Sequence, residues 1–454
     1  MFHSINPATG ETIAAHPEHE ADEVERRIAQ AATAYRTWRV TPVGERAALL
    51  ARIADAFAAE REALARIATQ EMGKTYASSL AEVDKCIAGF RHYAQAGPAM
   101  LADREIDVGG NGRAVARWEP LGPVLAVMPW NFPYWQVVRF AAPCILAGNV
   151  GLLKHASGVQ GVAAAIERTI LAGGAPEGLF QNLAIPSKAV GALIDDPRIV
   201  AVTLTGSEGA GQAVAEAAGR NLKKVVLELG GSDPFIVMPS ADLGRAAAVA
   251  VKARVQNSGQ SCICAKRMIV HADIYDAFLE KFTAGMRAVK AGDPFDDATD
   301  MGPLSSEEQR RTVIDQLADA QAKGATLLFG GEALPGAGAY MSAGILTDVP
   351  VDSDFARVEV FGPVAMVFRA RDIDDAIAIA NAVPFGLGSS VWTSDRGEQE
   401  RFARDIEAGM VAVNQMLASM PAAPFGGIKR SGHGRELSAD GLHEFMNLKT
   451  VFLG

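Results

Sequence analysis

One cysteine in the sequence has the surroundings of a nucleophile. Cys262 ends the segment Asn257-Ser-Gly-Gln-Ser-Cys262, a flexible turn that contains a glycine. A thiolate is a strong nucleophile, and nearby dipoles can lower the pKa of a free thiol from its usual value of about 8.5. An unpaired cysteine is more often a small buried apolar residue. The case for Cys262 therefore depends on the motifs around it.

A carboxylate and an amide upstream could assist such a nucleophile. Glu228 closes an apolar run directly before Leu229-Gly-Gly231. Burial there would raise its pKa toward neutrality and make it a general base, whereas an exposed strand-end glutamate would have no such role. Asn131 lies in Met128-Pro-Trp-Asn-Phe-Pro133, where rigid neighbours would fix its amide N–H. Such a donor stabilises an oxyanion, and its loss costs about 2.7–4 kcal/mol.

These motifs together resemble the aldehyde dehydrogenase superfamily, most closely its succinate-semialdehyde dehydrogenases. The resemblance runs from Asn6-Pro-Ala-Thr-Gly10 to Lys449-Thr-Val-Phe452 and covers nearly the whole chain. The segments that carry it are Pro129-Trp-Asn-Phe-Pro133, Leu153-Lys-His-Ala156, Thr205-Gly-Ser207 with Gly211, Glu228-Leu-Gly-Gly231, Gly259-Gln-Ser-Cys262, Glu359-Val-Phe-Gly-Pro363, Pro384-Phe-Gly-Leu-Gly388 and Pro424-Phe-Gly-Gly-Ile-Lys429. The resemblance implies a thiohemiacetal on Cys262, hydride transfer to a nicotinamide, and thioester hydrolysis by water that Glu228 activates. Asn131 would hold the oxyanion.

A glycine-containing turn is the candidate cofactor site. Thr205-Gly-Ser-Glu-Gly-Ala-Gly211 follows a predicted strand and opens a helix, where backbone N–H groups could bind a pyrophosphate. It differs from the Gly-x-Gly-x-x-Gly fingerprint, and taken alone it could be an ordinary turn. The resemblance implies that NAD or NADP is bound by Trp130, Lys154, Ser157, Gly206, Ser207, Gly211, Glu359 and Phe361.

Position 157 departs from many members of the family. They have a glutamate three residues after the lysine that corresponds to Lys154, where it binds both ribose hydroxyls and repels a 2′-phosphate. This chain has Ser157. Loss of the acidic residue relaxes the discrimination, and the choice between NAD and NADP stays open.

Arg139 is the candidate substrate-binding residue. It lies about two turns along a predicted helix that begins just past Asn131, where it would face the substrate tunnel and bind a carboxylate. An ion pair with a structural acid is the alternative. The resemblance makes succinate semialdehyde the leading substrate, with Trp135 and Phe425 as tunnel walls. A second arginine of another subgroup is replaced here by Gln256, so a broad-specificity aliphatic or aromatic aldehyde dehydrogenase is the alternative.

Cys264 lies two residues beyond the candidate nucleophile. Some related enzymes carry the same Cys-x-Cys pair as a redox switch, and the resemblance implies a reversible disulfide with Cys262 here. Such a bond needs Cα atoms within about 4.4–6.8 Å, so the loop must flex. A simple packing role for Cys264 is the alternative.

The expected fold class is α/β. Helical periodicity covers 21–39 and 45–71, and short β-branched runs then alternate with Ala-rich helical stretches, as in a parallel sheet covered by helices. The predicted architecture has two Rossmann-like, doubly wound α/β domains and a small β oligomerisation arm. The dinucleotide-binding domain is expected at 1–103 and 121–228 and the catalytic domain at 229–430. The arm is expected at 104–120, a hairpin centred on residues 109–112, and at 431–454.

Composition narrows the class of protein. The chain has 454 residues, 49% of them apolar, and a net charge of −10, which argues against nucleic acid or an anionic membrane as a partner. The four cysteines form no disulfide framework and the eight histidines no metal-ligand spacing, so no metal site is expected. We expect a cytoplasmic enzyme that acts as a homodimer or homotetramer. A non-redox thioesterase or esterase using the same Cys and Glu is the competing class.

Overall fold

The computed structural model describes residues 1–109 and 112–453. Its first α/β unit is a six-stranded sheet in the order β19-β9-β8-β5-β6-β7, parallel except for β19. The strands are β5 (Pro123–Met128), β6 (Val150–His155), β7 (Phe180–Asn182), β8 (Ala201–Thr205), β9 (Lys224–Glu228) and β19 (Gly432–His433). The chain runs outward from β5 to β7 and then returns to β8. Crevices at such a reversal, beyond the carboxyl ends of the strands, are where ligands bind in open α/β sheets.

Within the described residues, eight α-helices belong to this unit. They are α1 (Ala21–Trp38), α2 (Val43–Ala59), α3 (Arg61–Met72), α4 (Tyr76–Met100), α5 (Trp135–Ala147), α6 (Gln160–Ala172), α7 (Val190–Asp195) and α8 (Glu208–Arg220). The sequence predicts one helix over 45–71, but the structure divides it at Glu60, whose φ of −100° and ψ of 11° depart from helical values. Good helix formers flank that break, so periodicity gives no sign of it.

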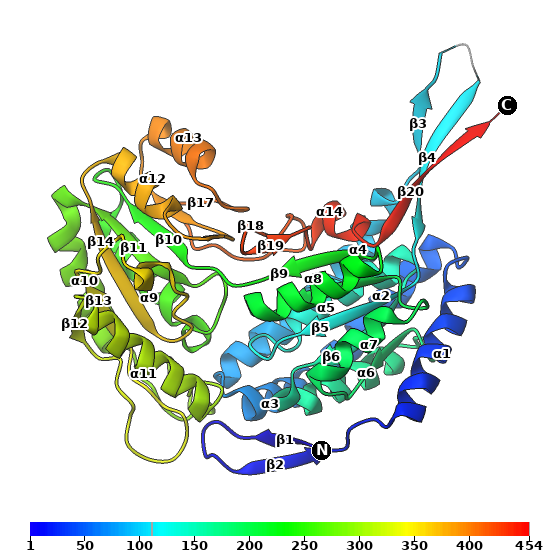
Figure 1. Ribbon diagram of the computed structural model, residues 1–454, viewed down its shortest axis with the longest axis horizontal. Coiled ribbons are helices and arrows are strands. Elements are labelled where there is room, and N and C mark those ends of the chain that lie inside the picture. The colour runs from blue at the N-terminus through cyan, green and yellow to red at the C-terminus, as the bar shows by residue number, and fades with distance from the viewer. Residues whose placement is uncertain (110–111, 454) are drawn as a thin grey trace.

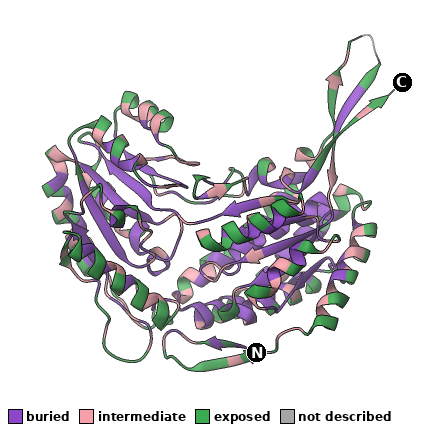
Figure 2. Cartoon of the chain, in the orientation of Figure 1, coloured by how far each residue is buried: buried purple, intermediate pink, exposed green. Residues whose placement is uncertain are grey.

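The second α/β unit is a seven-stranded sheet in the order β12-β13-β14-β11-β10-β16-β17, with only β12 antiparallel to its neighbour. Its strands are β10 (Asp233–Val237), β11 (Ala265–His271), β12 (Thr326–Phe329), β13 (Gly344–Thr347), β14 (Val364–Ala370), β16 (Ser390–Trp392) and β17 (Ala412–Val413). Its helices are α9 (Leu243–Val255), α10 (Tyr275–Ala288), α11 (Glu307–Ala322), α12 (Ile373–Asn381) and α13 (Arg396–Asp405). The strands of both sheets are largely buried and the outer helices face solvent, as Figure 2 shows.

A three-stranded antiparallel ribbon projects away from both units (Figure 1). It contains β3 (Arg104–Asp107), β4 (Arg113–Pro120) and the C-terminal β20 (Met446–Leu453). Positions 110 and 111 of the predicted turn lie outside the described residues. β19 falls within the range expected for the arm, yet it pairs with β9 of the first unit. The domain boundaries stay a prediction.

Short elements complete the chain. They are β1 (Phe2–Ile5) with β2 (Thr12–His16), β15 (Phe385–Gly386) with β18 (Ile428–Lys429), and α14 (Ser438–His443). No helix in the described part of the chain has both the length and the apolar character needed to cross a bilayer.

Candidate active site

The turn before Cys262 has an unusual backbone. Asn257, Ser258 and Gly259 adopt φ values of 52°, 56° and 74° in succession. This is the left-handed backbone conformation, which residues other than glycine rarely adopt. A Cβ atom on Gly259 would lie 2.2 Å from the carbonyl oxygen of Gly362. Glycine is therefore required where this turn packs against the segment 359–363.

We expect Gly259→Ala to damage both stability and catalysis. The added Cβ meets backbone atoms that have no room to move, and the positive φ adds strain of roughly 1–3 kcal/mol. A shift of the turn would displace Cys262, so kcat/KM should fall by about 10²-fold. Thermal unfolding and steady-state kinetics measure the two effects. Gly191→Ala, where a Cβ meets nothing within 4 Å, is the control, and equal behaviour of the two variants would contradict this role for Gly259.

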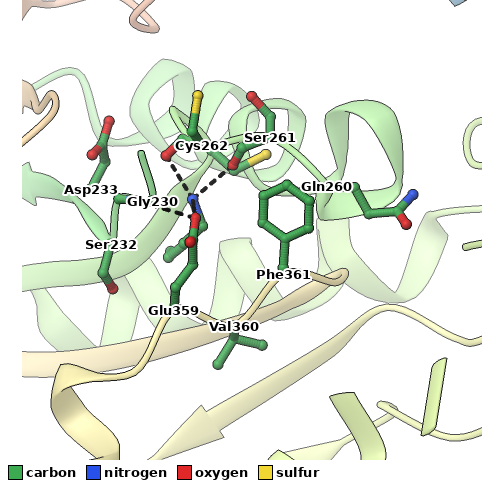
Figure 3. A network of polar contacts seen from close by, with 12 residues as sticks. Gly230, Ser232, Asp233, Gln260, Ser261, Cys262, Glu359, Val360 and Phe361 are labelled. Atoms are coloured by element: carbon green, nitrogen blue, oxygen red, sulfur yellow. Dashed lines mark hydrogen bonds and ion pairs between the residues drawn. The ribbon is translucent and has the colours of Figure 1, made fainter. Parts of the chain in front are cut away.

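A buried lysine ties Cys262 to the segment opposite. Lys266 Nζ donates to the carbonyl oxygens of Ser261 and Cys262, each at 2.7 Å, and lies 3.1 Å from Glu359 Oε1 (Figure 3). Glu359 Oε1 also accepts from Gly231 N–H at 3.2 Å. One cation thereby fixes the backbone on both sides of the nucleophile. The sequence analysis did not identify Lys266, because a lysine in an apolar strand shows its partners only after folding.

Two cavities meet at Cys262. The larger, of about 300 Å³, lies among Pro129, Trp130, Asn131, Gln136, Thr205, Gly206, Ser207, Leu229, Gly230, Cys262, Gln309, Thr312, Gln316, Glu359 and Phe361. The smaller, of about 90 Å³, lies among Lys85, Phe132, Trp135, Gln136, Arg139, Gln256, Ser261, Cys262, Ile263, Leu417, Ala418, Ser419 and Phe425. We call them the cofactor cavity and the substrate cavity. Cys262 and Gln136 line both, so a thiol stands where two ligands could meet.

The Cys262 thiol is protonated in this environment. Burial raises its pKa to about 12, against smaller lowering effects of Arg139 and Lys266. The sequence suggested that dipoles could lower this pKa, and here desolvation outweighs them. The thiol must therefore lose its proton before the sulfur can attack a substrate.

Glu228 is a buried carboxylate near the nucleophile. It ends β9 and is 2% exposed, and neither of its side-chain oxygens has a hydrogen-bond partner among the described residues. Burial raises its pKa, and the charge of Glu436 raises it further. The backbone that follows passes close to Cys262, because a Cβ on Gly231 would lie 2.9 Å from the Cys262 carbonyl oxygen. A carboxylate of this kind binds a proton more strongly than an exposed one and can act as a general base.

Asn131 is fixed at the other side of the cysteine turn. Its Nδ2 donates to the Gln260 carbonyl at 3.0 Å, and its own carbonyl accepts from Asn257 Nδ2 at 2.7 Å. His155 supports the same segment, because its Nε2 lies 2.9 Å from the Pro133 carbonyl while its Nδ1 accepts from Ala156 N–H. Burial lowers the pKa of His155 to about 4, so the ring is neutral and Nε2 is the donor. The amide is thus preorganised beside the nucleophile.

Five of the predicted cofactor residues line the cofactor cavity: Trp130, Gly206, Ser207, Glu359 and Phe361. Ser207 caps α8, with its Oγ 3.4 Å from Ala210 N–H, so the start of this helix faces the cavity. Trp130 and Phe361 lie edge to face, 5.8 Å apart. Backbone N–H groups at a helix start that opens onto the cavity could bind the pyrophosphate of a dinucleotide.

The other three predicted cofactor residues lie elsewhere. Lys154, near the end of β6, is 5% exposed and donates to Ser187 Oγ at 3.2 Å, and burial lowers its pKa. Ser157 is exposed at the start of the short 3₁₀ turn Ser157–Val159. Gly211 packs α8 on its neighbour, since a Cβ there would lie 2.6 Å from Leu229. Gly211 thus allows close helix packing and is not among the residues that line the cavity.

Arg139 lines the substrate cavity but also has an acidic partner. Its Nε forms an ion pair with Glu436, its Nη2 donates to Thr205 Oγ1 at 3.1 Å, and its guanidinium lies 4.8 Å from the Phe425 ring centre. The Arg139 and Glu436 side chains are only 3% and 6% exposed. Arg139 thus forms the ion pair with an acid that was the alternative interpretation, and it also lines the cavity. Binding of a substrate carboxylate by Arg139 stays a prediction.

The remaining predicted residues surround the same cavity. Trp135 and Phe425 line it, and so does Gln256, whose Nε2 has no partner among the described residues. Cys264 is fully buried, and its Sγ lies 3.6 Å from the Gln256 carbonyl oxygen. Its redox pairing with Cys262 stays a prediction. Within residues 1–109 and 112–453, no cluster of three or more potential metal ligands occurs.

Known proteins are similar to this chain over nearly its whole length. The model of the aldehyde dehydrogenase family matches residues 1–451. A protein of Mycolicibacterium paratuberculosis (strain ATCC BAA-968 / K-10), named succinate-semialdehyde dehydrogenase [NADP(+)], is 54% identical over 99% of this chain and 96% of its own. One of Mycobacterium tuberculosis (strain ATCC 25618 / H37Rv), named succinate-semialdehyde dehydrogenase [NADP(+)] 1, is 53% identical over 99% of both chains.

Solved structures agree in fold. Succinic semialdehyde dehydrogenase from Streptococcus pyogenes, in complex with NADP⁺, superposes with a TM-score of 0.97 at 36% identity and full coverage of both chains. An NAD-dependent aldehyde dehydrogenase from Sinorhizobium meliloti gives a TM-score of 0.97 at 32% identity, covering all of this chain and 91% of the other. The α/β fold class expected from the sequence is confirmed.

Proposed function

The chain belongs to the aldehyde dehydrogenase family, and we propose that it oxidises succinate semialdehyde to succinate with a preference for NADP. The activity of the family is the NAD(P)-dependent oxidation of an aldehyde to a carboxylate. The observation that carries the narrower proposal is that two cations, Lys85 and Arg139, line the substrate cavity. Cys262 lines both this cavity and the cofactor cavity. The names of the relatives at 53–54% identity support the same substrate and cofactor.

The residues suggest a sequence of proton and bond changes. The Cys262 thiol loses its proton to solvent water as its sulfur attacks the aldehyde carbon. The oxyanion of the resulting thiohemiacetal accepts from Asn131 Nδ2–H and the Cys262 backbone N–H. A nicotinamide cofactor held by Gly206, Ser207, Glu359 and Phe361 would supply the hydride acceptor. The remaining thioester is then attacked by water as Glu228 takes the water's proton, and the acid leaves Cys262. The raised pKa of Glu228 suits this role, because such a carboxylate binds a proton strongly.

Ser157 supports the preference for NADP. It is exposed where the chain leaves β6, and it brings no negative charge against a 2′-phosphate. Lys154 lies three residues before it, at the carboxyl end of the strand where the ribose of the cofactor is expected. A neutral hydroxyl at position 157 tolerates a 2′-phosphate more readily than a carboxylate would.

We expect Ser157→Glu to shift the preference toward NAD. The new carboxylate would accept from both ribose hydroxyls and repel a 2′-phosphate, so the NADP/NAD ratio of kcat/KM should fall by about 10- to 100-fold. Steady-state kinetics with each cofactor at saturating aldehyde measure the ratio. Ser157→Ala is the control, since it removes the hydroxyl without adding charge. An unchanged ratio in the Glu variant would mean that position 157 does not contact the ribose.

A panel of aldehydes tests the proposed activity. Succinate semialdehyde should give the highest kcat/KM, followed by uncharged aldehydes of similar length, and NADP should be preferred in each case. Equal values for charged and uncharged aldehydes would instead indicate a broad-specificity enzyme. Ester cleavage without formation of reduced nicotinamide from any aldehyde would indicate the competing thioesterase or esterase.

We also infer that the enzyme is a cytoplasmic homodimer or homotetramer. The ribbon of β3, β4 and β20 leaves Leu448, Phe452 and Leu453 exposed, and apolar strands of this kind favour pairing with another chain. All four cysteines are unpaired, which suits a reducing compartment.

A further inference from the structure

The substrate cavity contains a second cation that the sequence motifs do not mark. Lys85, on α4, lines the cavity together with Arg139 and Cys262. Its Nζ lies 4.5 Å from the centre of the Trp135 ring and donates to Ser419 Oγ at 2.7 Å. The ammonium group is therefore directed at the cavity wall by one hydroxyl and one aromatic face.

The charge of Lys85 lacks an acidic counterpart. Among the described residues, no carboxylate oxygen lies within 4 Å of its Nζ, whereas Arg139 is paired with Glu436. Glu82, on the same helix, is occupied by the ammonium of Lys74 and by the N–H groups of Tyr134 and Trp135. A partly buried cation without a partner is costly unless a ligand supplies the anion.

Ser419 is arranged to donate to the same anion. Its Oγ accepts from Lys85 Nζ and from Trp135 Nε1, the latter at 3.0 Å. A hydroxyl oxygen has two acceptor positions and one proton, and no described residue accepts that proton. Lys85 and Ser419 together thus present two donors at the wall of a small cavity that contains the nucleophile.

We propose that Lys85 binds the carboxylate of the aldehyde substrate and determines the preference for carboxylated aldehydes, with Ser419 as a second donor. This inference deepens the proposed function and depends on it. Arg139, with its charge shared by Glu436, then adds positive potential, and Lys85 makes the direct contact. The substrate carbonyl lies at Cys262 while its far end lies at Lys85.

If Lys85 binds the carboxylate, its pKa predicts a pH dependence of substrate binding that a purely structural role would not produce. Burial lowers it to about 8, with a smaller lowering effect of Arg139. The other groups that act on Lys85 are Cys86, Glu82 and Lys74. Lys85 is cationic below pH 8 and loses its charge above it, so binding of a carboxylate should weaken as the pH rises.

The experiment compares succinate semialdehyde with butanal in four proteins: wild type, Lys85→Met, Lys85→Arg and Arg91→Met. The measured quantity is the ratio of the two kcat/KM values from pH 6.5 to 9.5. Ionisation of Cys262 and Glu228 affects both substrates alike and cancels in this ratio. Arg91 is an exposed cation on the same helix, paired with Asp55, and serves as the matched control.

In Lys85→Met the ratio should fall by about 10- to 100-fold, chiefly through KM for succinate semialdehyde, because one charge-assisted hydrogen bond is lost. In the wild type the ratio should decline above pH 8, and in Lys85→Arg this decline should disappear, since arginine stays charged. Arg91→Met should match the wild type. If Lys85→Met fails to fold, the pH profiles of the wild type and Lys85→Arg still decide.

Two outcomes would overturn the inference, and they differ. A wild type with no preference for succinate semialdehyde over butanal removes the proposed substrate and the role of Lys85 with it. The other outcome is a wild type that prefers succinate semialdehyde while the Lys85→Met variant keeps this preference, or while the ratio does not change with pH. This result rejects the role of Lys85 and leaves the proposed function intact. The carboxylate would then be bound by Arg139.

Discussion

Replacing Cys262 by Ala should abolish aldehyde oxidation while cofactor binding persists. The sulfur is the atom that bonds to the aldehyde carbon in the proposed mechanism, and without it no thiohemiacetal forms. Turnover should fall by at least about 10⁴-fold, as for other enzymes that lose their nucleophile. The change removes a single sulfur atom, so the fold and the cofactor cavity should change little. Production of reduced nicotinamide and a titration of cofactor by tryptophan fluorescence measure the two properties.

Cys144→Ala is the matched control. Cys144 is a free cysteine buried in α5 and is not among the residues that line either cavity at Cys262, so its loss should affect stability more than turnover. Two results would count against Cys262 as the nucleophile. One is residual turnover within tenfold of the wild type, and the other is an equal loss of turnover in the two alanine variants.

Sequence patterns predicted the sheets well, because their strands are buried apolar runs. Short β-branched runs were expected as the strands of a parallel sheet, and β5 and β6 are two such runs in the structure. Polar residues that follow these strands were expected in the site, and Asn131 and Ser207 lie at its cavity. Local sequence is informative here because each motif is a strand end with its turn.

Contacts between distant segments could not be predicted in the same way. The ion pair of Arg139 with Glu436 joins α5 to a turn near the C-terminus, and nothing around Arg139 indicates that acid. Lys85 and Lys266 are single lysines in a helix and a strand, and their surroundings come from other segments. Desolvation also depends on the whole fold, which explains why the pKa of Cys262 is raised when its turn alone suggested a lower one.

Replacing Glu228 by Gln should separate the two halves of the reaction. Hydride transfer needs Cys262 and the cofactor, whereas hydrolysis of the thioester needs a base for the attacking water. A rapid burst of reduced nicotinamide, close to one per active site, should therefore precede a steady state that is slowed by about 10²–10⁴-fold. Stopped-flow absorbance at the reduced-cofactor band measures both phases.

The pH dependence of the steady state gives a second readout of Glu228. Burial raises the pKa of this carboxyl, and the active form is the carboxylate, so the wild-type rate of hydrolysis should increase with pH as Glu228 loses its proton. The Gln variant has no such group and should lose this rising limb. Glu444→Gln is the control: Glu444 accepts from Arg435 N–H at 2.7 Å, and because its charge raises the pKa of Glu228, the variant should keep the rising limb and move it to lower pH. If burst and steady state fall equally in Glu228→Gln, another residue activates the water.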